Sequence, residues 1–237
     1  MTEYLLIAIV IFIAGAVHGS VGFGQGLIAM PLMALFIDIK TVIPLSLFNG
    51  LVIGVTLVLR WRRRLDFSKA APLIISSMFG IPIGVYFLKT WDASALKMGL
   101  GVLLASYSLY SLTGVKIKTA MSAGWGYVFG FFSGMVGGAF GLNGPVSLLY
   151  VMSAKWAVEE KKVVLVTYFV TSNIMILILY FASGVPMTAP ATYAAICAPT
   201  AIAGAMIGAM FSDRLNKETL ERVIYGLVLI MGITLMV

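Results

Sequence analysis

Ten uninterrupted apolar stretches account for most of this 237-residue chain. Six of them are about 19 residues or longer, which is enough for a helix to cross a hydrocarbon core of about 30 Å. The other four are shorter and form two pairs. Because a helix of about 15 residues covers only about 22 Å, each pair is either one broken crossing or a hairpin that enters and leaves on one side. The long stretches are 41–59, 70–88, 95–113, 163–182, 187–211 and 219–237, and the pairs are 4–18 with 22–37 and 121–137 with 144–154.

The composition excludes a soluble fold. Hydrophobic residues make up 61% of the chain and charged residues 11%, whereas soluble domains are about half apolar and a quarter charged. The net charge of +7 does not indicate nucleic acid, because the basic residues lie in short loops where they set membrane orientation. The N-terminus lacks the basic region of a cleavable signal peptide, so we expect the first stretch to be retained. The sequence predicts an all-α polytopic membrane protein of ten helical segments in a lipid bilayer.

The distribution of basic residues favours hairpins. Eight single crossings would divide the 16 Lys and Arg residues almost evenly between the two sides. With hairpins over 4–37 and 121–154, one side keeps only Lys40, Lys89 and Lys97. This asymmetry matches the positive-inside rule, so we predict a multi-pass protein of the bacterial inner membrane with both termini non-cytoplasmic. The predicted cytoplasmic side carries Arg60, Arg62, Arg63, Arg64, Lys69, Lys116, Lys118, Lys155, Lys161, Lys162, Arg214, Lys217 and Arg222.

The two halves of the chain resemble each other in sequence. Three glycines of the first hairpin match three of the second at one offset, and Asn49 matches Asn173 at a slightly larger one. Each half holds a hairpin and three crossings, an odd number, so the copies are expected to be inverted. The first repeat covers 1–114, with hairpin 4–37 and spans 41–59, 70–88 and 95–113. The second covers 121–237, with hairpin 121–154 and spans 163–182, 187–211 and 219–237. Inverted repeats are common in secondary transporters, with the substrate at their interface near the midplane.

Each hairpin has a glycine-rich tip, and inverted tips approach the midplane from opposite sides, where we expect them to meet. The second arm of each hairpin presents its helix N-terminus there, with unpaired N–H groups and a partial positive charge that favours anions. All Lys, Arg, Asp and Glu residues lie in loops or at segment ends, so no carboxylate at depth favours a cation. The tips predict a small-anion site, and no catalytic residue, cofactor or metal is expected.

The candidate substrate-binding residues are glycines and polar residues of the tips and of the spans 41–59 and 163–182. Close helix packing is the alternative for the glycines, and we favour it for Gly80, Gly84, Gly204 and Gly208, which have no polar neighbours. Hydrogen bonds between helices are the alternative for the two matching asparagines. The candidates are His18, Ser20, Gly22, Gly24, Gln25, Gly26, Asn49, Gly138, Gly141, Asn143, Gly144, Tyr168, Ser172 and Asn173.

His18 is the only histidine, and its side chain type titrates near neutral pH. It is a candidate to donate to an anion or to carry a coupled proton, and a structural hydrogen bond between hairpin arms is equally open. Export of a monoanion is driven by about 2.3 kcal/mol per charge per 100 mV, without a coupling group. Uptake requires a coupled proton or sodium ion.

These features resemble the TauE/SafE family of sulfite exporters. The duplicated glycine-rich segments, Gly19–Pro31 and Gly138–Pro145, the basic loop Arg60–Arg64 and the paired helix glycines carry the resemblance over essentially the whole chain. Members often show a GxGGG core, in which this chain has Gln25 and Asn143 among the glycines. The resemblance implies transport of a small sulfur oxyanion such as sulfite, thiosulfate or an organosulfonate.

Three other functions are weighed against this one. Proton- or sodium-coupled uptake of another small organic anion fits the same residues, and a membrane assembly partner without transport activity is a further alternative. A membrane enzyme requires clustered acid–base or metal-binding residues, and one histidine with one cysteine offers too few. The sequence leaves a homodimer open.

Overall fold

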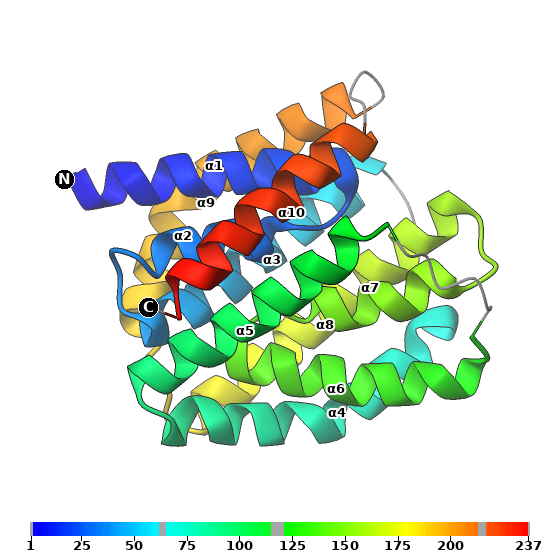
Figure 1. Cartoon of the computed structure of the whole chain (residues 1–237), viewed down its shortest axis with the longest axis horizontal. Helices are drawn as coiled ribbons and strands as arrows, with labels where there is room; N and C mark the ends of the chain where they lie inside the picture. The colour runs from blue at the N-terminus through cyan, green and yellow to red at the C-terminus, as the bar shows by residue number, and fades with distance from the viewer. Residues whose placement is uncertain (1, 62–64, 115–120, 213–216, 237) are drawn as a thin grey trace.

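The computed structural model describes residues 2–61, 65–114, 121–212 and 217–236, and this part of the chain folds into ten α-helices (Figure 1). The prediction of an all-α polytopic membrane protein is confirmed. Of the predicted cytoplasmic residues, Arg62, Arg63, Arg64, Lys116, Lys118 and Arg214 lie outside the described residues. The helices are α1 (Thr2–Val21), α2 (Gln25–Met33), α3 (Ile39–Trp61), α4 (Phe67–Thr90), α5 (Ala93–Leu112), α6 (Ala123–Phe140), α7 (Gly144–Ser153), α8 (Val158–Ala182), α9 (Thr188–Phe211) and α10 (Lys217–Thr234).

Six of the described helices are long and apolar enough to cross a membrane: α1, α3, α4, α5, α8 and α9. We expected residues 219–237 among the long spans and a shorter arm over 4–18. Helix α10 instead has charged residues in its first turns, including Glu221 and Arg222. Helix α1 continues for 20 residues through Gly15 and Gly19, because these glycines pack against α9 and tertiary contacts override their low helix propensity.

Two helix pairs dominate the packing, α4 with α6 and α1 with α9. Their backbones approach so closely that a Cβ at Gly80 would overlap the carbonyl oxygen of Phe131, and one at Gly208 that of Ala16. Gly84 and Gly204 meet their partner helices in the same way. The packing role favoured for these four glycines is therefore confirmed.

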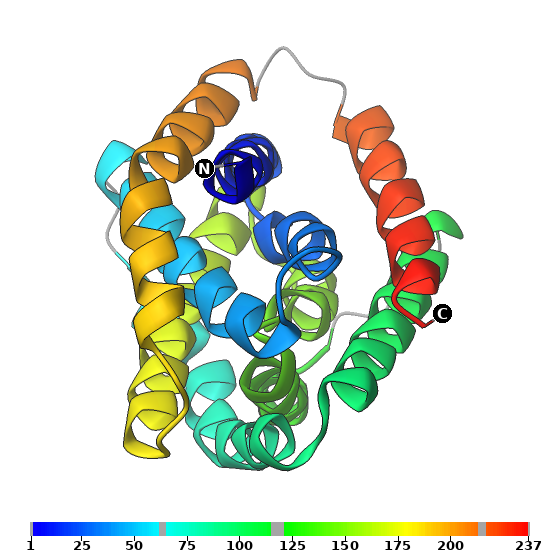
Figure 2. The ribbon, with the colours of Figure 1, turned by 90° about the vertical axis from the view of Figure 1, so that its left-hand side faces the viewer.

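Both termini lie at the same end of the molecule, on the left in Figure 1. Helix α1 begins at this end, and the chain turns back into α2 at residues 22–24. Helix α6 begins at the opposite end, and the chain turns back into α7 at residues 141–143. Viewed from the end with the termini, α5 and α10 lie side by side at one edge of the bundle (Figure 2). The two turns thus enter the bundle from opposite ends.

The outer surface of the bundle is apolar. Leu59, Phe79 and Phe181 expose 72%, 68% and 80% of their surface, and other large apolar side chains are exposed on most helices. Such coverage would be costly in water but matches a lipid environment. The chain is accordingly a multi-pass membrane protein.

Candidate functional site

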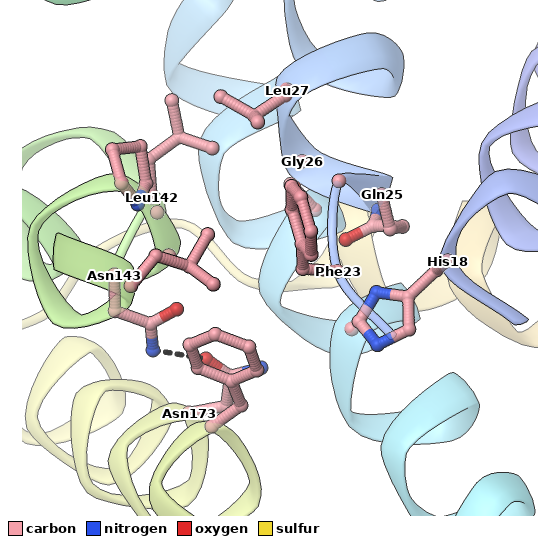
Figure 3. A pocket seen from close by; sticks show the side chains of 16 residues that line it. His18, Phe23, Gln25, Gly26, Leu27, Leu142, Asn143 and Asn173 are labelled. Atoms are coloured by element: carbon pink, nitrogen blue, oxygen red, sulfur yellow. Dashed lines mark hydrogen bonds between the residues drawn. The ribbon is translucent and has the colours of Figure 1, made fainter. Parts of the chain in front are cut away.

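The two glycine-rich tips are in contact. A Cβ at Gly26, in the first turn of α2, would lie 2.6 Å from Leu142 Cδ2 and 3.9 Å from the carbonyl oxygen of Gly141. A cavity of about 50 Å³ lies between the tips (Figure 3). A single water needs roughly 10–15 Å³ by this measure, so the cavity has room for a few small groups. Its lining comprises His18, Phe23, Gly24, Gln25, Gly26, Leu27, Ser46, Gly50, Gly141, Leu142, Asn143, Gly144, Pro145, Leu148, Phe169 and Asn173.

Left-handed backbone conformations shape both tips. Gly24, the N-cap of α2, has φ 101°, and Gly141, which ends α6, has φ 66°. Residues with a Cβ rarely adopt these angles, whereas glycine does so readily. The amide of Gly141 closes the helix by donating to the carbonyl oxygen of Gly137 at 2.7 Å. The tip glycines are therefore needed for the two reversals themselves.

Two helix N-termini meet the cavity. In α2 the amide of Ile28 donates to the carbonyl oxygen of Gly24 at 3.2 Å, so the earlier N–H groups of the first turn have no acceptor within the helix. Asn143 is the N-cap of α7, and Pro145 in its first turn contributes no N–H group. Both helices direct the positive end of their dipoles to the cavity, which favours a negatively charged ligand.

The second tip is held by side-chain hydrogen bonds. Asn143 Nδ2 donates to Ser172 Oγ and, at 3.0 Å, to Asn173 Oδ1. The backbone oxygen of Asn143 accepts from Ser133 Oγ at 2.6 Å and from Ser147 Oγ at 2.7 Å. Tyr168 OH in turn donates to Ser133 Oγ at 2.9 Å. This buried network fixes the tip against α6 and α8.

The first tip is surrounded by buried polar atoms without partners. Both ring nitrogens of His18, Nε2 of Gln25 and Oγ of Ser46 form no hydrogen bond, although these three residues are 6%, 5% and 1% exposed. Figure 3 shows Gln25 and His18 near each other on one side of the cavity, with Asn143 and Asn173 on the other. A buried polar group without a partner is costly, so these atoms indicate a place where water or a ligand binds.

Eight of the fourteen predicted residues line the cavity, and six lie elsewhere. Ser20 Oγ donates to the carbonyl oxygens of Ala16 and Gly208, at 2.8 and 3.1 Å, and links α1 to α9. Gly138 packs against α4 and accepts from Tyr180 OH at 2.7 Å. The remaining four are Gly22, which lies beside Lys162, the buried Asn49, and Tyr168 and Ser172 of the hydrogen-bond network.

Several lining residues were not predicted. On α3 we selected Asn49, but Ser46 and Gly50, one turn apart on one face, reach the cavity while Asn49 does not line it. A Cβ at Gly50 would lie 2.9 Å from Asn173 Nδ2 and 3.4 Å from Gln25 Oε1. The spacing of Ser46 and Gly50 was a signal for that face. No sequence pattern marks the other unpredicted lining residues. They are Phe23, Leu27, Leu142, Pro145, Leu148 and Phe169.

Among the residues that the structure describes, no charged side chain lines the cavity. Within the described ranges, no group of three or more His, Cys, Asp or Glu side chains is placed to hold a metal ion. The cavity instead offers amide and imidazole groups and two helix N-termini. Its chemistry depends on hydrogen-bond donors and dipoles.

An apolar helical bundle with a small internal cavity at the meeting point of two helix reversals is a multi-pass membrane protein with an enclosed site. The sequence model of the sulfite exporter TauE/SafE family matches residues 7–235, and the chain belongs to this family. A similar protein, the probable sulfite/organosulfonate exporter TauE of Cupriavidus necator, is 26% identical over 180 residues, which cover 73% of this chain and 70% of that protein. No solved structure matches the chain.

Proposed function

We propose that this protein carries a small sulfur oxyanion, such as sulfite, thiosulfate or an organosulfonate, across the membrane and binds it in the cavity between the tips. The observation that carries the proposal is the set of unpartnered buried atoms at the first tip, Gln25 Nε2 and the ring nitrogens of His18, beside two helix N-termini. An oxyanion offers several acceptors at once. It would accept from Gln25 Nε2 and from the ring nitrogen of His18 that carries the proton.

A cavity whose described lining residues carry no charge suits a monoanion that must also leave. A buried lysine or arginine would hold the anion strongly, whereas N–H dipoles bind it without a full opposite charge. Gln25 and His18 are the side chains assigned to the substrate, with the backbone of Gly24, Gly26 and Gly144. Asn143 donates both of its side-chain N–H groups within the protein and holds the opposite wall of the cavity. The chain's membership of an exporter family and the name of its relative from Cupriavidus necator support a sulfur oxyanion.

The proposed architecture is a pair of inverted repeats, 1–114 and 121–237. Helix α1 of the first packs on α9 of the second, and α6 of the second packs on α4 of the first, which is the exchange expected of corresponding helices. The two tips then belong to different repeats. Rocking of one repeat against the other would open the cavity to each side in turn. By the positive-inside rule, both termini are assigned to the non-cytoplasmic side.

Export is the direction of transport that requires the fewest coupling groups. A monoanion leaving a cell gains about 2.3 kcal/mol per 100 mV of inside-negative potential, so no coupled ion is needed. If the protein works in uptake, His18 is the group assigned to a coupled proton, because it lies in the cavity lining. Imposing potentials of either sign on proteoliposomes and measuring sulfite flux separates the two directions.

The test of the site is sulfite flux into proteoliposomes containing the double variant Gln25→Leu with Asn143→Leu. We expect flux to fall at least about tenfold, since a lost hydrogen bond to a charged group costs roughly 1.5–3 kcal/mol. Ser108→Ala is the matched control, because it removes another buried, unpartnered polar atom, on α5 outside the cavity lining. Undiminished flux in the double variant would show that the substrate binds elsewhere.

A further inference from the structure

The start of α8 brings a lysine against the first tip. Lys162 Cγ would lie 3.8 Å from a Cβ at Gly22, and Gly22 is two residues from Gly24 in the cavity lining. Helix α8 begins at the end of the molecule opposite the termini (Figure 1). The Lys162 side chain therefore lies between that end and the cavity.

One face of α8 connects this lysine with the cavity. Lys162, Phe169 and Asn173 follow at helical spacing, and the last two line the cavity. At 1.5 Å per residue, Phe169 lies about 10 Å and Asn173 about 16 Å along the axis from Lys162. An anion entering along this face would meet the ammonium group first and the amide of Asn173 last.

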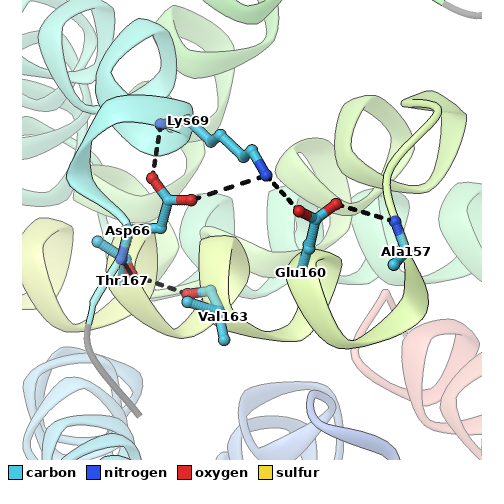
Figure 4. A network of polar contacts seen from close by, with 6 residues as sticks. All are labelled: Asp66, Lys69, Ala157, Glu160, Val163 and Thr167. Carbon is cyan, nitrogen blue, oxygen red and sulfur yellow. Dashed lines mark hydrogen bonds and ion pairs between the residues drawn. The ribbon is translucent and has the colours of Figure 1, made fainter.

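Two other lysines at this end are engaged in structural contacts, and Figure 4 shows those of Lys69. Lys69 Nζ lies 2.6 Å from Glu160 Oε1 and 3.9 Å from Asp66 Oδ2. Lys161 Nζ donates to the carbonyl oxygen of Met152 at 2.8 Å. These interactions join α4 to α8 and α8 to the end of α7, so both ammonium groups serve the packing of helices.

The ammonium group of Lys162 has a looser contact. Its Nζ lies 3.7 Å from Glu159 Oε1, and the Glu159 side chain is 56% exposed. The side chain of Lys162 is 22% exposed, so it is partly covered by the protein but still accessible to water. Exposed pairs at such a separation contribute little, and an anion can replace the carboxylate at small cost.

The position that corresponds to Lys162 in the first half of the chain carries an acid. At the offset that relates Asn49 to Asn173, Lys162 corresponds to Asp38, just before α3. Asp38 is exposed, and its Oδ2 accepts from the backbone N–H of Lys40 at 3.0 Å. Of these two corresponding positions, only the one on α8 carries a cation that attracts anions.

We propose that Lys162 forms an anion-capture site at the entrance to the cavity from the end opposite the termini, where a sulfur oxyanion binds before it reaches the tips. This inference rests on the proposed function. A charge near an entrance raises the local concentration of an oppositely charged substrate and its rate of association. The site therefore acts on loading of the cavity and not on translocation.

The experiment measures KM and maximal rate of sulfite flux in proteoliposomes for Lys162→Gln, Lys162→Arg and the control Lys161→Gln. The Debye length is about 30 Å at 0.01 M salt and about 3 Å at 1 M. At low salt we expect Lys162→Gln to raise KM about three- to tenfold with an unchanged maximal rate. The increase disappears at 1 M salt, while Lys162→Arg and Lys161→Gln match the wild type at both salt concentrations.

An unchanged KM at low salt in Lys162→Gln would overturn the capture site. So would an increase that persists at 1 M salt, or one that Lys161→Gln shares. The double variant at Gln25 and Asn143 is measured alongside. If its flux is lost while Lys162→Gln behaves as wild type, only the capture site fails. Undiminished flux in the double variant refutes the cavity instead, and absence of flux in the wild type refutes both.

Discussion

Around the second tip, Asn143 donates to two side chains and its backbone oxygen accepts from two serines. Around the first tip, His18, Gln25 and Ser46 are equally buried, yet four of their polar atoms have no partner. The two tips share a glycine pattern and a chain reversal. They differ in whether the protein itself satisfies the polar groups that surround the reversal.

This difference assigns the tips separate tasks. A satisfied buried network is rigid, whereas unpaired buried groups lower stability until a partner arrives. We therefore interpret the second tip as a fixed wall of the cavity, and the first tip as the part whose unpaired groups the proposed ligand completes. Substitutions should therefore affect stability mainly at the second tip and binding at the first.

The largest expected effect on stability comes from Asn143→Leu. It leaves Ser172 and Asn173 without the donor that they share, and each buried group left unsatisfied costs about 1–3 kcal/mol. We expect the free energy of unfolding to fall by about 2–4 kcal/mol. Gln25→Leu is the matched variant, because Gln25 Nε2 forms no hydrogen bond that the substitution would remove. We expect the free energy of unfolding of this variant to be nearly unchanged. Denaturation of the purified proteins in detergent measures both.

Equal destabilisation by the two leucine variants would contradict the comparison between the tips. It would mean that Gln25 is held within the protein as firmly as Asn143. A stable Asn143→Leu protein would likewise show that the network at the second tip contributes little.

Gly24→Ala is expected to have an intermediate effect. Gly24 has φ 101°, and the nearest atom to an added Cβ is Val17 Cγ1 at 3.5 Å, an ordinary contact. The cost is therefore backbone strain, about 1–2 kcal/mol. Gly144 is the control, because it begins α7 and a Cβ there meets only Phe169 at 3.8 Å. Gly144→Ala should be neutral or stabilise by up to about 1 kcal/mol.

Thermal unfolding in the same detergent compares these two alanine variants. Destabilisation of similar size in both would show that the side-chain volume at the cavity matters more than the left-handed angle at Gly24. Reduced sulfite flux in Gly24→Ala alone would link the angle to the orientation of the α2 N-terminus.

The sequence was sufficient for features that depend on period and composition. The apolar stretches predicted the helices, and the paired glycines at Gly80 and Gly84 predicted close packing, since both signals are local. The face of α3 that lines the cavity was not predicted. Asn49 is buried, as expected for its position, but the rotation of the helix turns Ser46 and Gly50 to the cavity. That rotation is determined by the contacts of α3 with α8 and α9. These contacts cannot be read from a single sequence.

The two tips also could not be distinguished from the sequence. Ser133, which anchors Asn143, lies ten residues before it and resembles any other serine in an apolar helix. The partners of Asn143 come from α6, α7 and α8, so only the fold brings them together. A glycine pattern predicts where the chain reverses. It does not predict which reversal is satisfied by its neighbours.

The smallest expected effect on stability is that of His18→Leu. Both ring nitrogens lack a partner, and replacing an unsatisfied polar group by an apolar one of similar size is nearly neutral. We expect the free energy of unfolding to change by less than about 0.5 kcal/mol, while sulfite flux decreases because the cavity loses a donor. His18→Gln restores a donor and should recover part of the flux. If His18→Leu instead loses more than about 1 kcal/mol, the imidazole is held by a structural hydrogen bond between the hairpin arms, and the first tip resembles the second more closely than the unpaired atoms indicate.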